Sequence, residues 1–277
     1  MTIDPNLVPR LALNDGMTIP QLGLGVWQIP QRWAAELVGQ ALGLGYRHID
    51  TAQMYGNERG VGEAVRRSGL PRDEVFVTTK CRNDRHGRRH ALEALEASLE
   101  RLGLDWVDLY LIHWPQPRRD QYLETWEGLI EARERGLTRS IGVSNFHAAH
   151  LERIISGTGV IPAVNQIELH PLLTQEPLVG VNRALGIQVE SWSPLAAGGI
   201  LDDGTLRRIA QAHGRSVAQV VIRWHLQLGY IVIPKSSRPQ RMAENLAVFD
   251  FELGAEDVRR IGALNRHRRT GADPDDF

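Results

Sequence analysis

Residues 75–114 read VFVTTKCRNDRHGRRHALEALEASLERLGLDWVDLYLIHW and predict a strand, a helix and a second strand in succession. The runs Val75–Lys80 and Val107–Trp114 are rich in apolar and β-branched residues, which is typical of buried strands. Between them, Arg88–Leu102 has the spacing of an amphipathic helix. Two buried strands joined by a helix predict a parallel pair, the repeating unit of an α/β protein.

The same alternation of strands and helices continues on both sides of this segment. The other predicted strands are Gln21–Val26, Arg47–Asp50, Ser140–Ser144, Ala163–Leu169, Gln188–Ser193 and Tyr230–Pro234. The other predicted helices are Trp33–Leu44, Glu58–Ser68, Tyr122–Arg135, Ala148–Ser156, Glu176–Leu185 and Val217–Leu228. The pattern therefore yields eight strands with helices between them.

Eight strands with intervening helices in 277 residues predict a single α/β domain, residues 1–277, with the closed (β/α)8 architecture of a TIM barrel. An open, doubly wound sheet is the alternative, but no G-x-G-x-x-G sequence follows any predicted strand. Ahead of the barrel, Leu11–Ile19 predicts a β-hairpin that turns at Asp15 and Gly16.

The composition indicates which binding partners and which cellular compartment are expected. The chain is 42% hydrophobic with a formal net charge of −1, so neither nucleic acid nor an anionic membrane is an expected partner. A single cysteine, Cys81, fits a reducing compartment. No apolar stretch approaches the roughly 18 residues that a membrane span needs. We therefore expect a cytoplasmic protein that is not inserted in a membrane.

The ends of the predicted strands are polar and aromatic. Active sites of TIM barrels lie at the C-terminal ends of the strands. Only two of the 32 basic residues are lysines, Lys80 and Lys235, and each ends a predicted strand. The residues at or just after these ends are Trp27, Asp50, Tyr55, Lys80, His113, Trp114, Ser144, Asn145, Gln166, Glu168, His170, Trp192, Ser193, Lys235 and Ser236.

Asp50, Tyr55, Lys80 and His113 follow three consecutive strands, so a barrel would bring them together. An ammonium about 4 Å from a phenol would stabilise the phenolate by at most about 4 kcal/mol, so Lys80 is expected to lower the pKa of Tyr55. Tyr55 would then be a general acid, a role worth about 10²–10⁴ in rate. Asp50 would supply the counter-charge of a buried Lys80, and His113 would orient a carbonyl group. Taken singly, a rim aspartate, a loop tyrosine and a core histidine remain alternative interpretations.

Several longer segments resemble the aldo-keto reductase family. GYRHIDTAQMYGNE (residues 45–58), VDLYLIHWP (residues 107–115) and IPKS (residues 233–236) are similar to its three signature regions. Residues 140–146 and 162–171 are similar as well, and the resemblance runs from about Leu11 to Asn265. The nearest similarity is to the bacterial 2,5-diketo-D-gluconate reductase type, and the residues that carry it are 137–145, 224–227 and 248–251.

The resemblance implies reduction of an aldehyde or ketone by NADPH, with Asp50, Tyr55, Lys80 and His113 as the catalytic residues. For the cofactor it implies Ser144, Asn145 and Gln166 on the nicotinamide amide and Trp192 on its ring. It implies Ser193, Leu195 and residues 197–199 on the pyrophosphate. It also implies Lys235, Ser236, Arg238 and Arg241 on the 2′-phosphate, with Glu244 and Asn245 toward the adenine. Lys235, Arg238 and Arg241 also surround a helix start at Pro239, which favours a phosphate. Trp27, Trp114 and His113 would surround the substrate, and the family implies a monomer.

Two other interpretations stay open at this point. The barrel could bind the cofactor in a regulatory or structural role with little turnover. It could also be an isomerase or aldolase that forms a Schiff base on Lys80.

His86 and His90 have helical i, i+4 spacing but no evident third ligand, so no metal is expected. Cys81 is expected to face the core rather than the site, because neighbours on a strand face opposite sides. The short tail after Arg266 predicts an open pocket.

Overall fold

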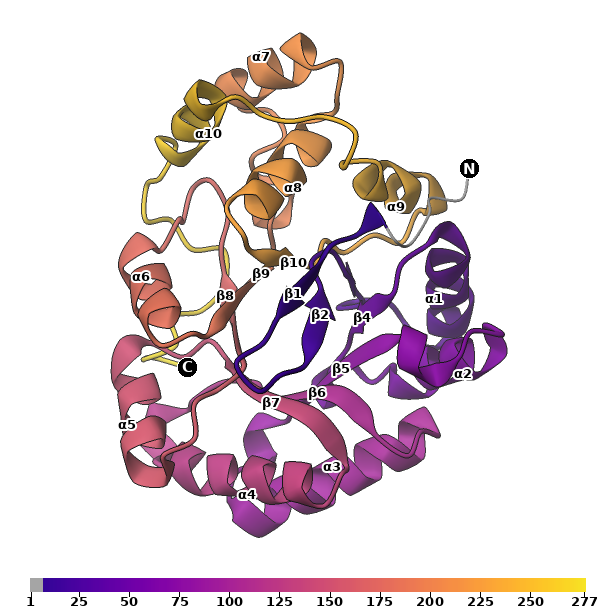
Figure 1. Cartoon of the computed structure of the whole chain (residues 1–277), viewed down its shortest axis with the longest axis vertical. Coiled ribbons are helices and arrows are strands. Elements are labelled where there is room, and N and C mark those ends of the chain that lie inside the picture. The colour runs from indigo at the N-terminus through magenta and orange to yellow at the C-terminus, as the bar shows by residue number, and fades with distance from the viewer. Residues whose placement is uncertain (1–6) are drawn as a thin grey trace.

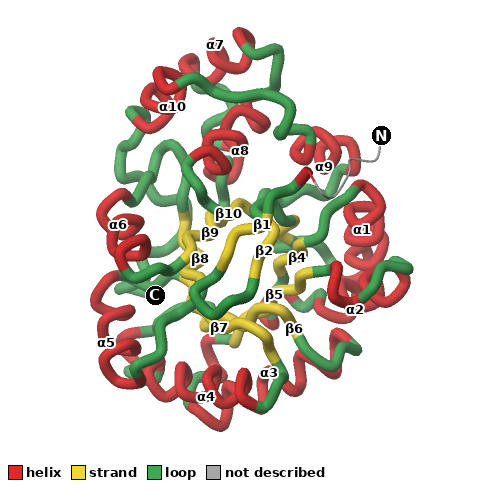
Figure 2. Tube along the Cα trace, viewed as in Figure 1, coloured by secondary structure: helices red, strands yellow, loops and turns green. Residues whose placement is uncertain are grey.

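The computed structural model of the chain describes residues 7–277 and is a closed parallel barrel surrounded by helices (Figures 1 and 2). The barrel strands are β3 (Leu24–Gly25), β4 (His48–Asp50), β5 (Phe76–Cys81), β6 (Val107–Ile112), β7 (Thr138–Ser144), β8 (Val164–Glu168), β9 (Gln188–Trp192) and β10 (Ile231–Val232). They pair in this order, all parallel. Parallel bridges from Leu22 to Val232 and from Gly25 to Lys235 close the first strand onto the last. The predicted TIM barrel is confirmed.

Helices form the outer ring (Figure 2). They are α1 (Gln31–Leu44), α2 (Glu58–Arg67), α3 (Arg88–Leu102), α4 (Tyr122–Glu134), α5 (Ala148–Thr158), α6 (Glu176–Ala184), α7 (Gly204–Ala212), α8 (Val217–Gln227), α9 (Pro239–Leu246) and α10 (Ala255–Gly262). The start of α9 at Pro239 was predicted, whereas α7 and α10 were not. Over residues 7–277, no helix combines the length and apolarity needed to cross a membrane.

The predicted hairpin closes one end of the barrel. Its strands, β1 (Arg10–Ala12) and β2 (Thr18–Pro20), pair antiparallel, and the turn contains Gly16 at a φ of 86°. Figure 1 shows the hairpin lying across the barrel at the end nearer the viewer. Leu13 and Ile19 pack there against residues at the starts of the barrel strands, among them Phe76. A functional site is therefore left to the opposite end, where the strands finish.

Neighbouring side chains of β5 point to opposite sides of the strand, which separates Lys80 in the barrel from Cys81 in the core. Lys80 is fully buried and points into the barrel, where it meets Asp50 of β4. Cys81, the next residue, belongs to the apolar layer between sheet and helices, as expected. Burial raises the pKa of Cys81 to about 12, so this thiol stays protonated at neutral pH. The predicted strand Val107–Trp114 was too long, because β6 ends at Ile112 and leaves His113 and Trp114 on the rim.

The contact between α2 and α3 depends on a glycine. A methyl group on Gly62 would collide with the carbonyl of Leu102, whereas one on Gly39 in α1 would meet nothing within 4 Å. We expect Gly62→Ala to lower the free energy of unfolding by about 1–3 kcal/mol, the usual cost of overpacking. Gly39→Ala should raise it by about 0.5–1 kcal/mol, because alanine favours a helix. Urea unfolding of both variants checks this, and equal changes would contradict the packing argument.

Candidate active site

A cavity of about 390 Å³ opens at the C-terminal ends of the strands, opposite the hairpin. Its lining combines residues predicted for the site with residues that were not predicted. The predicted ones are Trp27, Asp50, Tyr55, His113, Trp114, Ser144, Asn145, Gln166, Trp192, Ser193, Ala197 and Lys235. The others are Gly25, Met54, Ile233, Thr270, Gly271 and Phe277. Lys80 lies beneath this surface and is fully buried.

The ammonium of Lys80 joins an aspartate and a tyrosine below the cavity. Its Nζ atom lies 2.7 and 2.9 Å from the two carboxylate oxygens of Asp50 and 3.0 Å from the carbonyl oxygen of Thr51. The Tyr55 hydroxyl is 3.4 Å away. A single ammonium therefore contacts both a carboxylate and a phenol. The compact ammonium of a lysine suits this arrangement better than the planar guanidinium of an arginine.

Tyr55 is held by the loop that follows β4. It ends a short 3-10 helix, Gln53–Tyr55, and the Gln53 side chain donates to Ser98 at 2.8 Å and accepts from the backbone of Arg82 at 3.0 Å. Asn57, also buried, donates to the carbonyls of Val26 and Ile29 at 2.9 and 3.0 Å. Buried amide side chains fixed at both ends leave this loop little freedom. The phenol is therefore presented to the cavity by a rigid segment.

Burial changes the expected electrostatics of the phenol. Burial raises the pKa of Tyr55, and the neighbouring Lys80, which favours the phenolate, only partly offsets it. The expectation that Lys80 would bring this pKa below its usual value is therefore wrong for the site without ligands. Burial alone would lower the pKa of Lys80, but Asp50 and Tyr55 raise it overall. At neutral pH the site thus holds a protonated phenol beside a charged ammonium.

His113 supplies a neutral imidazole next to the phenol. Its ring centroid is 5.7 Å from that of Tyr55, edge to face. Burial, and then the charge of Lys80, keep the pKa of His113 well below its usual range. Its Nδ1 atom is buried and has no hydrogen-bond partner within residues 7–277. A neutral imidazole has one N–H to donate, so His113 can act as a hydrogen-bond donor in this wall.

Asn145 organises the opposite wall. Its backbone takes a left-handed φ of 63°, and its side-chain nitrogen donates to the carbonyl of His113 and to Ser144 Oγ, both at 3.0 Å. Its side-chain oxygen accepts from the Trp192 indole N–H at 2.8 Å. Gln166 is also buried, and its nitrogen donates to Asp50 Oδ2 at 2.9 Å. Ser144, Asn145, Gln166 and Trp192, which were predicted to hold the nicotinamide, therefore line the same cavity as Tyr55.

The segment after β9 turns sharply beside this wall. Ser193, Ala196 and Ala197 all have positive φ values, 49°, 48° and 52°. Non-glycine residues in this region are strained, and such strain is concentrated at functional sites. Ser193 and Ala197 line the cavity, whereas Leu195 does not.

Most of the predicted phosphate-binding residues lie outside the cavity, just before α9 and in its first turn. Lys235 lines the cavity edge, and Arg238 precedes Pro239, the first residue of the helix. The Ser236 hydroxyl accepts from the backbone N–H of Arg238 at 3.1 Å and so fixes the approach to the helix. Arg241 is exposed in the first turn. Glu244 and Asn245 follow in the same helix but do not line the cavity.

A second buried carboxyl, Glu190 of β9, was not predicted. The nitrogen of Gln166 donates to it at 2.8 Å, so Glu190 and Asp50 share one amide group. Burial, followed by the charge of Asp50, raises the pKa of Glu190 to about 8. His48 lies 3.6 Å away, and burial lowers its pKa to about 3. The available signal was a charged residue within a strand that is otherwise buried.

Part of the tail forms a wall of the cavity, contrary to the expectation of an open pocket. Glu168 at the end of β8 accepts from the backbone N–H and the hydroxyl of Thr270, each at 2.6 Å, and from the backbone N–H of Gly271 at 3.2 Å. Farther along, the ring of Phe277 packs on Trp114 with centroids 4.4 Å apart. The tail crosses the mouth because a buried carboxylate anchors its beginning.

Comparison with known proteins shows which family the chain belongs to. The model of the aldo/keto reductase family matches residues 20–266. The chain belongs to the aldo/keto reductase family. It is 50% identical to Escherichia coli methylglyoxal reductase DkgA over 269 residues, which cover 96% of this chain and 97% of the relative. The family that the motifs indicated is thus confirmed, and with it an oxidoreductase.

Solved structures of aldo/keto reductases are similar over nearly the whole chain. A mutant of Gox0644 in complex with NADPH is 49% identical with a TM-score of 0.93, covering 96% of this chain and 97% of that one. The Bombyx mori aldo-keto reductase in complex with NADP is 40% identical with a TM-score of 0.90, covering 98% and 96%. At these identities the likeness supports the family as well as the fold.

Proposed function

We propose that this aldo/keto reductase uses NADPH to reduce an aldehyde or ketone to an alcohol, with Tyr55 as the proton donor. The observation that carries the proposal is the contact of Lys80 with both Asp50 and Tyr55 below a cavity that His113 also lines. Relatives support the cofactor, since Gox0644 and the Bombyx mori enzyme were crystallised with NADPH and NADP. A relative named methylglyoxal reductase supports a small carbonyl substrate.

The residues that line the cavity fit a nicotinamide and a small carbonyl compound. A volume of about 390 Å³ is within the usual range for small-molecule sites, and it leaves no room for a whole dinucleotide. Ser144, Asn145 and Gln166 would hold the nicotinamide amide and Trp192 its ring. The segment from Ser193 to Leu195, with Lys235, Ser236, Arg238, Arg241, Glu244 and Asn245, would hold the remainder. Bound NADPH supplies the hydride.

The chain's own residues supply the proton and the orientation. His113, neutral because burial lowers its pKa, donates its N–H to the carbonyl oxygen and holds it near the Tyr55 hydroxyl. As negative charge develops on that oxygen, Tyr55 releases its proton to it. An alkoxide is far more basic than a phenolate, so this transfer is favourable even from a phenol with a raised pKa. Lys80 stabilises the phenolate that remains, and Asp50 keeps Lys80 charged.

A Schiff-base mechanism on Lys80 is disfavoured by the same contacts. Such a lysine must present a neutral amine to its substrate. Here the side chain is fully buried, bound to Asp50, and its pKa is raised. A regulatory barrel without turnover would have no need for a buried charged pair directly beneath a tyrosine. The reductase is therefore the function that the geometry supports best.

The direct test is NADPH oxidation at 340 nm with a panel of small aldehydes and dicarbonyls, with NADH in parallel. We expect turnover with several members of the panel and a clear preference for NADPH. NADPH binding without turnover of any carbonyl would favour the regulatory alternative. The expectations of a monomer and of a cytoplasmic location stay predictions, which gel filtration and fractionation can check.

The cofactor preference gives a separate prediction. Replacing both Arg238 and Arg241 with alanine should weaken NADPH binding about 10²- to 10⁴-fold, because each of the two charge-assisted hydrogen bonds contributes roughly 1.5–3 kcal/mol. NADH binding should be unchanged, since NADH lacks the 2′-phosphate that these two arginines would contact. Quenching of protein fluorescence measures both dissociation constants. Arg260→Ala, an exposed arginine on α10, is the matched control, and equal losses for NADPH and NADH would refute the assignment.

A further inference from the structure

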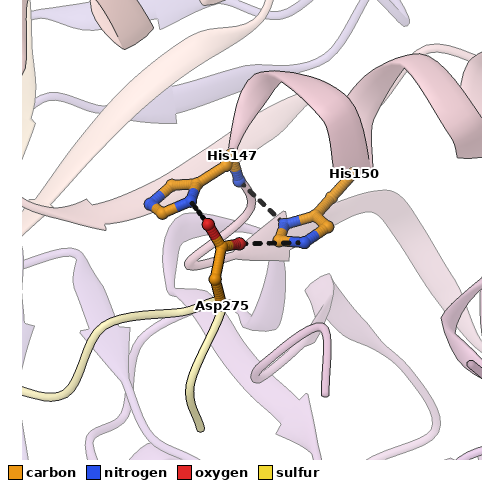
Figure 3. Close-up of side chains that lie close together, drawn as sticks. All are labelled: His147, His150 and Asp275. Carbon is orange, nitrogen blue, oxygen red and sulfur yellow. Dashed lines mark hydrogen bonds and ion pairs between the residues drawn. The ribbon is translucent and has the colours of Figure 1, made fainter. Parts of the chain in front are cut away.

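Two histidines at the start of α5 hold the tail near its last residue (Figure 3). The Nδ1 atom of His147 lies 3.1 Å from Asp275 Oδ2, and the Nε2 atom of His150 lies 3.3 Å from Asp275 Oδ1. The two rings are parallel, with centroids 5.7 Å apart. His150 is buried, whereas the Asp275 side chain is 61% exposed. Within residues 7–277 this is the only group of three side chains spaced to hold a metal ion, and it does not include His86 or His90.

The hydrogen bonds on the far side of each ring determine which nitrogen carries the proton. The backbone N–H of His147 donates to His150 Nδ1 at 3.1 Å, so the proton of a neutral His150 is on Nε2. Arg269 lies 3.2 Å from His147 Nε2, and a guanidinium can only donate. The proton of a neutral His147 is therefore on Nδ1. Both imidazoles thus direct their single N–H at the carboxylate of Asp275.

With these tautomers, His147 and His150 both bind the carboxylate of Asp275. We call this contact the clasp, and the same tautomers argue against a metal site. A metal ion needs the lone pair of a ring nitrogen, and the other nitrogen of a ligating histidine ordinarily donates its N–H to an acceptor. Here the lone pairs of both rings are already occupied by N–H donors, and the N–H groups face the aspartate. Metal binding would require both rings to lose the contacts made by His147 and Arg269.

We propose that His147 and His150 are positioning residues that hold Asp275, and through it Phe277, as the aromatic wall of the substrate pocket. The proposal rests on the proposed function and deepens it. Phe277 lies two residues beyond Asp275 and packs on Trp114, and both rings line the cavity. Glu168 anchors the start of the same segment at Thr270, so the clasp is its second fixed point. The clasp therefore favours carbonyl compounds that carry an aromatic group.

The clasp predicts a specific kinetic signature for Asp275→Asn. An asparagine replaces one of the two carboxylate oxygens by an NH2 group, which can only donate, so one of the two imidazole N–H groups loses its acceptor. We expect the KM for 4-nitrobenzaldehyde to rise about threefold to tenfold, which is the usual scale of one aromatic contact. The KM for methylglyoxal, which is too small to need that wall, should change less than twofold. kcat for both aldehydes and the dissociation constant of NADPH should stay within twofold.

Two further variants separate this role from a general effect on the fold. Asp276→Asn makes the same chemical change one residue later, where the side chain is 79% exposed. Among the described residues it meets only the exposed Arg118, at 3.4 Å, so the change should leave every constant unchanged. Asp275→Asn in a Phe277→Ala background should add nothing, because the clasp acts through that ring. Hydrogen exchange of the 266–277 segment should accelerate in Asp275→Asn but not in Asp276→Asn.

Three results would overturn the proposal. One is a KM effect of Asp275→Asn that equals that of Asp276→Asn. Another is an effect that persists undiminished in the Phe277→Ala background. The third is micromolar binding of Zn²⁺ that the Asp275→Asn variant loses, since it would contradict the tautomers. If the wild-type protein reduces neither aldehyde, the proposed function fails instead, and hydrogen exchange still tests the clasp.

Discussion

Replacing Lys80 with methionine is expected to lower the free energy of unfolding by about 3–5 kcal/mol and to abolish turnover. The side chain is fully buried, and Asp50, which it neutralises, is only 2% exposed. Removing the ammonium leaves a buried carboxylate whose remaining side-chain donor is Gln166. Turnover is lost because nothing then stabilises the phenolate of Tyr55. Urea unfolding and steady-state kinetics measure the two effects separately.

The double variant Asp50→Asn/Lys80→Met distinguishes the two consequences. Because it removes both charges, it should regain most of the lost stability while remaining inactive. Lys235→Met makes the same substitution at the exposed lysine and should change the free energy of unfolding by less than about 0.5 kcal/mol. A double variant as unstable as Lys80→Met would contradict the coupling of Asp50 and Lys80 that their 2.7 Å contact indicates.

Removal of the Tyr55 hydroxyl tests the proposed proton donor itself. We expect Tyr55→Phe to lower kcat by about 10²–10⁴, the usual contribution of a general acid. The dissociation constant of NADPH should change less than threefold, because the ring and the loop that holds it remain. Met54→Leu, a change in the adjacent residue, which also lines the cavity, serves as the control and should keep most of the activity. Activity of Tyr55→Phe within threefold of wild type would remove Tyr55 from the mechanism.

Much of the fold and of the catalytic group could be predicted because both depend on sequence periodicity. The strand pattern gave eight parallel strands, and parallel strands bring their C-terminal ends to one edge. In a closed barrel Asp50, Lys80 and His113, which follow consecutive strands, are therefore expected to lie close together. Helices α7 and α10 were missed because eight or nine residues give too few apolar repeats, although Asp203 caps α7 by accepting from Thr205 and Leu206.

The features that were mispredicted or missed depend on contacts between distant segments. The sign of the Tyr55 pKa shift follows from burial, which no local pattern reports. Glu190 acquires its significance only through Gln166, which it shares with Asp50. The tail was expected to leave the pocket open because the sequence shows only that it is short. The contacts that hold it, such as those of Glu168, cannot be predicted from the sequence. Glu168 is about a hundred residues away from the segment that it holds.

The central claim is that Tyr55 protonates a carbonyl oxygen as the carbonyl is reduced. The most direct measurement mixes enzyme preloaded with NADPH with excess 4-nitrobenzaldehyde and records a single turnover at 340 nm, for wild type and Tyr55→Phe side by side. We predict a rapid loss of NADPH absorbance with one equivalent of alcohol formed by the wild type, and a rate at least about a hundredfold lower for Tyr55→Phe. Equal single-turnover rates for the two proteins would contradict the account.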